Sequence, residues 1–416
     1  MTGEQIESLL PALAAFLGRF RKGFRNGNSF KHLQRYLVGL MSDLKRKSIE
    51  PIALASGVAV RSLQEFLSQL RWRDGWIQDE LMRQVTDRHA TDHAIGVLDE
   101  SGHPKQGEKT PGVQRQYCGE TGKIANCVVG VHLIYTDNDR QNPFTCALGS
   151  DLYLPKRWLE NADRCKEAHI PKNAPFRTKW RIGVDLVKQA TAQGVRFRYL
   201  TFDEVYGQVP AFWTELNRLG QWAVGEVPRV FRCWASEPKY HSLQEPFAAK
   251  PVERVATHSR AFRGQEWKTV RIKDTTRGPM LWKIKASRVW IIDSAEAESR
   301  PTERAYWLIV AWQPKSGEIK YFLSNAPASA DVEELVRAAF ARWHVEKWFE
   351  RAKQEAGLGA FEVRTYQGLI RHWLCCRLAM LFLAEETTRL RGEKSGDHVR
   401  AGGRGGQPAD PATDAA

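Results

Sequence analysis

The segment from Ala341 to Lys353 carries two patterns that both require an α-helix. Arg342, Glu346 and Lys353 are separated by four and seven residues, so a helix places them within about 40° of one another around its axis. An apolar stripe with the same period runs beside them. Its members are Val345, Trp348, Phe349, Ala352 and Ala356. The segment is therefore predicted to be an amphipathic helix that keeps one carboxylate between two cations.

A carboxylate between two cations has an ordinary structural explanation and a functional one. Charge pairs at i,i+4 are common on solvated helix faces, and they would explain an isolated match of this kind. Alternatively, Glu346 holds a divalent metal ion while Arg342 and Lys353 hold phosphate oxygens. The choice depends on whether other carboxylates converge on this helix.

Two apolar, β-forming runs elsewhere in the chain each stop at two adjacent acids, Asp99-Glu100 and Asp203-Glu204. The first run leads into a turn-like Ser-Gly-His-Pro sequence, and both are expected to be strands that end at these acids. Successive side chains of a strand point to opposite faces, so only one acid of each pair can face a shared site. We choose Asp99 and Asp203, the first residue after each run. Either one alone is more often a turn former.

Two aspartates and a helical glutamate that converge are the ligands that two-metal phosphoryl transfer requires. Two Mg²⁺ ions about 3.5–4 Å apart activate the attacking oxygen and stabilise the leaving oxygen. Carboxylates supply the hard oxygen ligands that Mg²⁺ prefers, and Mn²⁺ accepts the same ligands. We therefore expect Asp99, Asp203 and Glu346 to be catalytic metal ligands for cleaving and joining nucleic-acid strands.

These blocks together resemble the DDE-type transposases of bacterial insertion sequences, in the group whose third-acid helix carries a Y-R-E-K signature. The insertion sequence seven-oh-one type is the most similar. The resemblance covers about residues 20–385 and rests on the blocks that begin at Asp99 and Asp203 and on the R-x3-E-x6-K spacing. Weaker matching blocks lie at residues 112–119, 122–127, 152–158, 176–179 and 357–372.

One position departs from the signature. Ala339 stands where the family has Tyr, on what is expected to be the helical stripe of Glu346. A phosphate or base contact made by that Tyr is then absent here or supplied by another residue, for which Trp343 is a candidate. The metal ligands are unaffected.

The resemblance implies an α/β chain in which a β-rich insertion interrupts an RNase H-like catalytic core, preceded by an all-α N-terminal DNA-binding domain. The residue patterns divide the chain in the same way. The expected parts are the helical domain at 1–90, the core at 91–231 and 326–390, the insertion at 232–325, and a polar, Gly/Pro-rich tail at 391–416, expected to be disordered. Trp267, Trp282 and Trp290 of the insertion are candidates for base stacking, with core packing as the simpler explanation.

Residues 49–68 within the helical region look like a helix-turn-helix. Its second helix would present Arg61, Ser62 and Gln64 to DNA. Small helical hairpins show the same pattern about as often, so a packing role stays open. Lys105, Arg115 and Lys123 lie in Gly-flanked loops after the first acid, where they would contact phosphates or be solvated.

Composition agrees with a DNA partner. The 416 residues include 62 Lys and Arg against 48 Asp and Glu, a formal net charge of +14. This excess favours a polyanion, and double-stranded DNA fits better than a membrane because no apolar run of about 18 residues is present. The N-terminus does not read as a signal peptide, and the seven cysteines show no zinc-binding spacing. We expect reduced thiols and a cytoplasmic location, on the bacterial nucleoid when DNA is bound.

The expected function is a transposase that binds element ends through residues 1–90, cleaves DNA with water, and joins the freed 3′ hydroxyl to target DNA. Bringing two ends together implies at least a homodimer during the reaction. Two alternatives use the same residues. An RNase H-like nuclease would cut strands without joining them, and a catalytically silent DNA-binding repressor would do neither.

Overall fold

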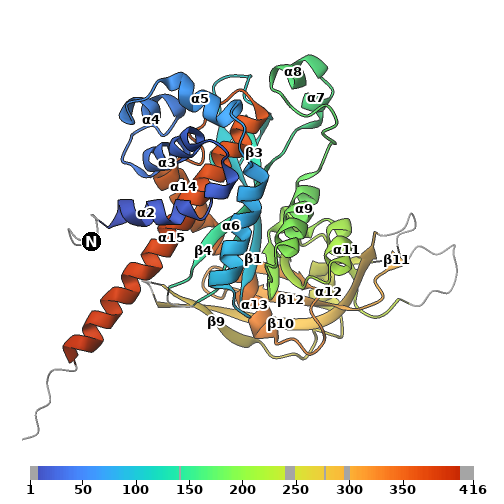
Figure 1. Ribbon diagram of the computed structural model, residues 1–416. Helices are drawn as coiled ribbons and strands as arrows, with labels where there is room; N and C mark the ends of the chain where they lie inside the picture. Colours follow the sequence, from blue (N-terminus) through green and yellow to red (C-terminus); the bar gives the residue numbers. More distant parts are fainter. Residues whose placement is uncertain (1–7, 140–141, 239–248, 276–277, 295–299, 403–416) are drawn as a thin grey trace, which may run out of the picture.

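The computed structural model describes residues 8–139, 142–238, 249–275, 278–294 and 300–402, and only the backbone of 392–402. Over these residues the chain is a mixed α/β structure built around one 13-stranded sheet. Helices from the two ends of the chain gather at one end of the molecule, and strands from the middle of the chain form the other (Figure 1). No helix of the described part is long and apolar enough to cross a membrane.

The N-terminal region is helical, in agreement with its apolar periodicity. Its elements are α2 (Leu9–Gly18), the 3₁₀ turn η1 (Arg21–Gly23), α3 (Gly27–Met41), α4 (Ile49–Ala55), α5 (Val60–Ser68) and α6 (Asp74–His89). Gly57 joins α4 to α5 with a φ of 63°, a conformation that favours glycine. Leu63 and Phe66 of α5 are fully buried.

These helices pack directly on the C-terminal part of the chain. Arg371 of α15 (Tyr366–Gly402) is buried and forms an ion pair with Asp74 at 3.2 Å. The Lys47 ammonium donates to the carbonyls of Leu40 in α3, at 2.7 Å, and of Glu355 in α14 (Trp343–Ala356), at 2.8 Å. One continuous apolar core extends from the N-terminal helices to α15.

The central strands follow the order β4-β3-β1-β5-β6. Their bounds are β1 (Ile95–Pro104), β3 (Lys123–Thr136), β4 (Thr145–Leu152), β5 (Tyr199–Phe202) and β6 (Ala223–Val227). β1, β5 and β6 run parallel to one another, whereas β3 is antiparallel to both β1 and β4. β2 (Gln114–Cys118) pairs with the first part of β3. Parallel strands β1 and β5 therefore present their carboxyl ends at the same edge.

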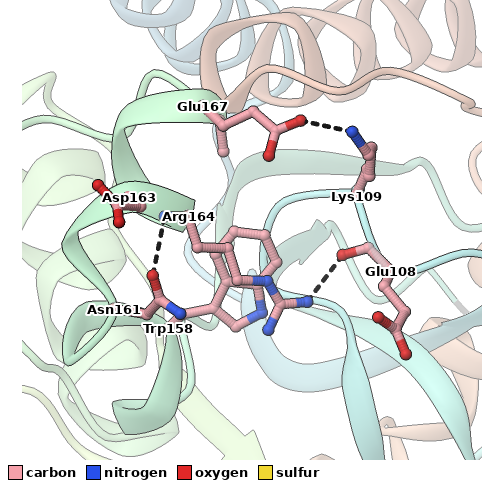
Figure 2. A pocket seen from close by; sticks show the side chains of 8 residues that line it. Glu108, Lys109, Trp158, Asn161, Asp163, Arg164 and Glu167 are labelled. Atoms are coloured by element: carbon pink, nitrogen blue, oxygen red, sulfur yellow. Dashed lines mark hydrogen bonds and ion pairs between the residues drawn. The ribbon is translucent and has the colours of Figure 1, made fainter.

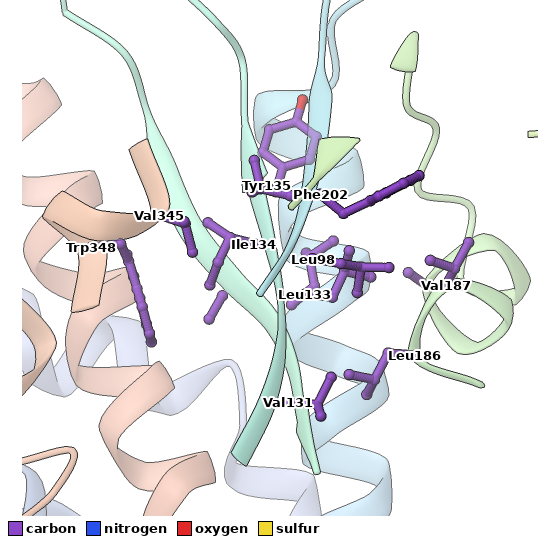
Figure 3. Packing of buried hydrophobic residues seen from close by; sticks show 14 of the residues in the cluster. Leu98, Val131, Leu133, Ile134, Tyr135, Leu186, Val187, Phe202, Val345 and Trp348 are labelled. Atoms are coloured by element: carbon purple, nitrogen blue, oxygen red, sulfur yellow. The ribbon is translucent and has the colours of Figure 1, made fainter. Parts of the chain in front are cut away.

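Helices cover both faces of this sheet (Figure 3). Val345 and Trp348 of α14 lie on one face beside Ile134 of β3, while Leu186 of α9 (Lys179–Ala192) lies on the other, near Leu98 of β1. All five side chains are buried. The alternation of a strand assigns Leu98 and the residue after it to opposite faces. Asp99 must therefore point toward α14.

The stretch between β6 and α13 (Val332–Phe340) extends the sheet. β13 (Ile319–Ser324), β12 (Tyr306–Trp312) and β10 (Gly278–Asp293) continue it beyond β6, and β9 (Lys268–Thr275) forms a hairpin with β10. Shorter elements are β7 (Arg232–Trp234), β8 (Lys250–Pro251), β11 (Arg300–Pro301) and α12 (Val252–His258). The β-rich stretch is thus joined to the core by the backbone pairing of β13 with β6.

Several elements differ from the sequence expectations. β1 does not stop at Asp99 but continues to Pro104, because its pairing with β3 extends past its pairing with β5. Ala339 lies on α13, a different helix from Glu346, so the two do not share a stripe. α15 runs to Gly402, so the first part of the 391–416 tail is helical and not disordered. Residues 403–416 lie outside the described residues.

The remaining connections carry further elements. β2, β4, α7 (Lys156–Leu159) and α8 (Ala162–Glu167) lie between the first strand and α9, and α10 (Glu204–Gly207) and α11 (Pro210–Arg218) lie between β5 and β6. All seven cysteines are free thiols.

Candidate active site

Three elements bring the predicted acids to one region. Asp99 lies on β1, two residues beyond the part of the strand that pairs with β5. Asp203 follows β5 directly and caps α10, accepting a hydrogen bond from the Val205 amide at 3.0 Å. Glu346 lies in the first turn of α14. Asp99 and Asp203 are thus placed by neighbouring parallel strands, and Glu346 by the helix that covers that face.

The guanidinium of Arg342 joins two of these acids. Its Nη1 lies 3.0 Å from Oδ2 of Asp99, and its Nη2 lies 3.2 Å from Oε1 of Glu346. The Asp99 side chain is only 12% exposed, whereas Glu346 is 64% exposed. Arg342 is the N-cap residue of α14 and keeps helical angles, so it stands one turn before Glu346 on the same face. The cation therefore bridges a buried and an exposed carboxylate.

Burial makes both aspartates resist ionisation, and the charge of Asp203 adds to this effect at Asp99. The pKa of Asp99 is raised to about 7, first by burial and then by the charge of the neighbouring Asp203, while Arg342 opposes both effects. Burial also raises the pKa of Asp203, and Arg342 again opposes it. A second positive charge at this position would relieve the repulsion between the two carboxylates. The electrostatics therefore favour a cation here.

The donor set fits a divalent metal ion in its chemistry, since hard carboxylate oxygens converge on one positive charge. The side chains do not form a closed metal cage as they stand: within the described ranges, no group of three or more His, Cys, Asp or Glu side chains could hold a metal. Arg342 supplies the positive charge between Asp99 and Glu346 instead. A metal bound by these acids would require the Arg342 side chain to move.

The second acid of each pair faces elsewhere. Glu100 lies on the α9 side of the sheet and forms an ion pair with Lys179 at 2.7 Å. Glu204 is exposed at the start of α10. The alternation of strand side chains therefore separates Asp99 from Glu100.

Two residues near the acids were not identified from the sequence as site residues. Glu226 of β6 is one of the acids whose charge acts on Arg342, and it also forms an ion pair with Lys320 at 2.7 Å. Tyr206 of α10 is fully buried, and its hydroxyl has no hydrogen-bond partner among the described residues. Burial raises the pKa of Tyr206, and the charges of the nearby acids Glu100, Asp99 and Asp203 raise it further. The sequence signal for Glu226 was its position near the end of a β-forming segment, residues 221–227.

The predicted DNA-contacting cations have different surroundings. Lys353 forms an ion pair with Glu120 of the β2–β3 turn at 2.7 Å. The Lys105 ammonium donates to the carbonyls of Gly359 and Phe361, and burial lowers its pKa to about 8. An internal structural role therefore accounts for Lys105.

The other predicted contacts lie at the surface. Arg115 and Lys123 are exposed on the β2–β3 hairpin. Arg61 and Gln64 are exposed on α5, Ser62 is half-buried there, and Arg61 pairs with Glu65 at 2.7 Å.

The three tryptophans of the β-rich stretch between β6 and α13 are not equivalent. Trp282 is 4% exposed and packs on Phe340, which agrees with core packing. Trp290 is half-buried. Trp267 is 37% exposed, with the Lys285 ammonium 4.9 Å from its ring centroid. Only Trp267 of the three is open enough to meet a base.

A pocket of about 340 Å³ lies between the loop after β1 and the α7–α8 hairpin (Figure 2), and none of Asp99, Asp203 and Glu346 lines it. The Arg164 guanidinium stacks on Trp158, with its Cζ 3.8 Å from the ring centroid, and it donates a hydrogen bond to the backbone carbonyl of Glu108. Lys109 and Glu167 close one side with an ion pair of 2.7 Å. These contacts hold the loop against the hairpin, and they explain the local structure without a ligand.

Comparison with known proteins gives two matches. The family model described as DDE superfamily endonuclease matches residues 19–279, which include Asp99 and Asp203 and end before α14. A probable transposase for insertion sequence element IS701, from Microchaete diplosiphon, is 31% identical over 188 residues. That alignment covers 44% of this chain and 44% of the relative, less than half the length of either.

Proposed function

The chain belongs to the DDE superfamily of endonucleases, and we propose that it is a DNA transposase that acts on the ends of an insertion sequence. It would bind double-stranded DNA ends, cleave them, and join the freed 3′ hydroxyl to target DNA. The reaction would take place on the bacterial nucleoid in the cytoplasm, with two copies of the chain holding a pair of ends.

The observation that carries this proposal is the arrangement of Asp99, Asp203 and Glu346 around one cation. Asp99 and Asp203 come from adjacent parallel strands, and Arg342 contacts Asp99 at 3.0 Å and Glu346 at 3.2 Å. A purely structural ion pair would not need a buried carboxyl such as Asp99 whose charge a half-buried neighbour, Asp203, repels. Acids that bind a cation during a reaction do need this arrangement.

The chain's own side chains would divide the work. Asp99, Asp203 and Glu346 would hold two Mg²⁺ ions, or Mn²⁺, which when bound activate the attacking oxygen and stabilise the leaving oxygen. Arg342 would leave its carboxylate partners and bind a phosphate oxygen of the substrate, for which its planar guanidinium is suited. Lys353, two turns further along α14, would exchange Glu120 for a neighbouring phosphate.

The remaining parts of the chain would bind DNA outside the acid site. We propose residues 1–90 as a DNA-binding domain, with the helix-turn-helix at 49–68 presenting Arg61, Ser62 and Gln64. Support comes from the turn at Gly57 and from the exposed outer face of α5. Arg115 and Lys123 would contact the DNA backbone from the β2–β3 hairpin, where their exposure leaves them accessible.

The test uses DNA from either side of the coding region as the substrate. Asp203→Asn and Glu346→Gln should abolish Mg²⁺-dependent cleavage and leave binding of the ends nearly unchanged, because each removes a metal ligand and alters no residue of the N-terminal helices. Glu350→Gln, an exposed acid on the same helix, is the matched control and should cleave normally. Cleavage at the wild-type rate in either active-site variant would contradict the assignment.

The alternatives are separated in the same assay. Supplying a pre-cleaved end and a target duplex distinguishes a transposase, which gives joined products, from a nuclease, which gives none. A DNA-binding repressor would bind ends and cleave nothing.

A further inference from the structure

A pair of lysines meets on one aromatic ring beside the candidate site. The ring belongs to Trp343, the first residue of α14. The Lys347 ammonium lies 4.4 Å from its centroid, and the Lys273 ammonium of β9 lies 4.0 Å from it. The β-rich stretch and the helix that carries Glu346 therefore come into contact at this ring. We refer to Lys273, Trp343 and Lys347 as the lysine seat.

The lysine seat concentrates positive charge without an anion of its own. Lys273 is half-buried, and burial together with the charge of Lys347 lowers its pKa, while Glu346 opposes the change. Neither lysine has a hydrogen bond or ion pair with any described residue, although Lys268 of the same strand pairs with Glu333 at 2.6 Å. The two ammonium charges repel each other, and an anion bound between them would relieve that repulsion. This pattern is expected of a binding position for an anionic ligand.

The ring itself is not open for stacking on a base. Both ammoniums lie over it, and the ring of His344 is 4.1 Å away between centroids. Cation–π attraction instead fixes where the two ammoniums stand. The N-terminal end of α14, a helix of 14 residues, adds its positive dipole at the same place. Trp343 is therefore a positioning residue and not a replacement for the base contact of a missing Tyr.

We propose that the lysine seat binds one backbone phosphate of the DNA strand that enters the acid site, next to the phosphate that is cleaved. The two ammoniums contact the phosphate oxygens, and the Trp343 ring fixes where the ammoniums lie. This inference rests on the proposed function, since it takes DNA to be the substrate of Asp99, Asp203 and Glu346. It adds a contact from β9, and so gives the β-rich stretch a direct part in holding the cleaved strand.

The first test measures the binding of a short DNA duplex as a function of salt concentration, in Ca²⁺ so that no cleavage occurs. Lys273→Gln and Lys347→Gln should each weaken binding roughly three- to tenfold and reduce the slope of log affinity against log salt by about 0.9. Lys268→Gln, on the same strand with its charge already paired, should change neither quantity. Trp343→Leu should resemble the lysine variants, and Trp343→Phe should restore binding because a phenyl ring keeps the cation–π contact.

The second test locates the phosphate. A set of duplexes, each with one neutral methylphosphonate link, should contain one position at which the wild type loses affinity and Lys273→Gln loses none further. If the affinity lost through the neutral link and the affinity lost through Lys273→Gln were additive at every position, the lysine seat would contact none of these phosphates and the proposal would be wrong. The proposal would also fail if the wild type bound DNA tightly and Lys273→Gln and Lys347→Gln bound it with the same affinity and the same salt slope. If the wild type itself bound no DNA, the proposed function would be at fault. Thermal melting of each variant identifies any that fail to fold.

Discussion

Replacing Asp99 by Asn should remove catalysis and at the same time stabilise the metal-free protein. The Asp99 carboxyl has a pKa raised from 3.8 to about 7, first by burial and then by Asp203. An unfolded chain gives up this proton near pH 4, whereas the folded chain keeps it until about pH 7. The stability of the metal-free protein therefore falls as pH rises through this window, because the unfolded state binds fewer protons.

The size of the effect follows from the shift. A difference of about three pKa units corresponds to about 4 kcal/mol at pH 8. Asn has no charge to bury, and its oxygen can still accept the bond from the Glu100 amide that Asp99 accepts at 2.7 Å. For a chain of this length, about 4 kcal/mol corresponds to a rise in melting temperature of about 5 °C.

Thermal unfolding in a chelator, followed from pH 4 to pH 8, measures this gain. The variant and the wild type should melt together near pH 4 and separate progressively up to pH 7. Asp151→Asn is the control, since its carboxylate is held by Arg177 at 2.7 Å and the same substitution should lower stability. Added Mg²⁺ should stabilise the wild type and not Asp99→Asn. An Asp99→Asn variant that melts below the wild type at pH 8 without metal would refute the reasoning.

Three further predictions concern cations. Arg342→Gln should bind Mn²⁺ roughly tenfold more tightly in titration calorimetry, because it removes a competing positive charge that lies 3.0 Å from Asp99. The same variant should cleave DNA more slowly. An unchanged Mn²⁺ affinity would show that the guanidinium does not compete with the metal. Lys353→Ala should weaken binding of a pre-cleaved end and reduce the slope of log affinity against log salt by about one phosphate contact, whereas Glu350→Gln should change neither. An unchanged slope would leave Lys353 with only a structural role, the ion pair with Glu120. Arg371→Ala should cost about 3–5 kcal/mol of stability, measured by denaturant or thermal unfolding, because it leaves Asp74 and several buried carbonyls without their partner; a loss under about 1 kcal/mol would contradict this.

Local patterns in the sequence were sufficient to place several key side chains. The spacing of Val345 and Trp348 identified the buried face of α14, and strand alternation separated Asp99, which faces α14, from Glu100, which pairs with Lys179. Both patterns depend on the geometry of a single element, and neither requires knowledge of its neighbours.

Contacts between distant segments could not be read in the same way. The extension of β1 past Asp99 depends on its pairing with β3, and nothing within β1 itself signals it. The partners of Lys105 and the approach of Lys273 to Trp343 likewise follow from how separate elements pack. Glu226 reached the site because β6 lies beside β5 in the sheet, an order that strand composition does not encode.

The way Lys47 and Arg371 fasten the N-terminal helices has a consequence for where DNA would be cut. Lys47 bonds to the ends of both α3 and α14, and Arg371 ties Asp74 to α15, so no free linker separates α5 from the acids. An enzyme whose DNA-binding domain is joined to its catalytic domain by a flexible linker can cut at variable distances from the sequence that it recognises. Here the rigid attachment would fix the distance between the bound sequence and the cleaved phosphate. The number of base pairs between them would therefore be the same at both ends of the element.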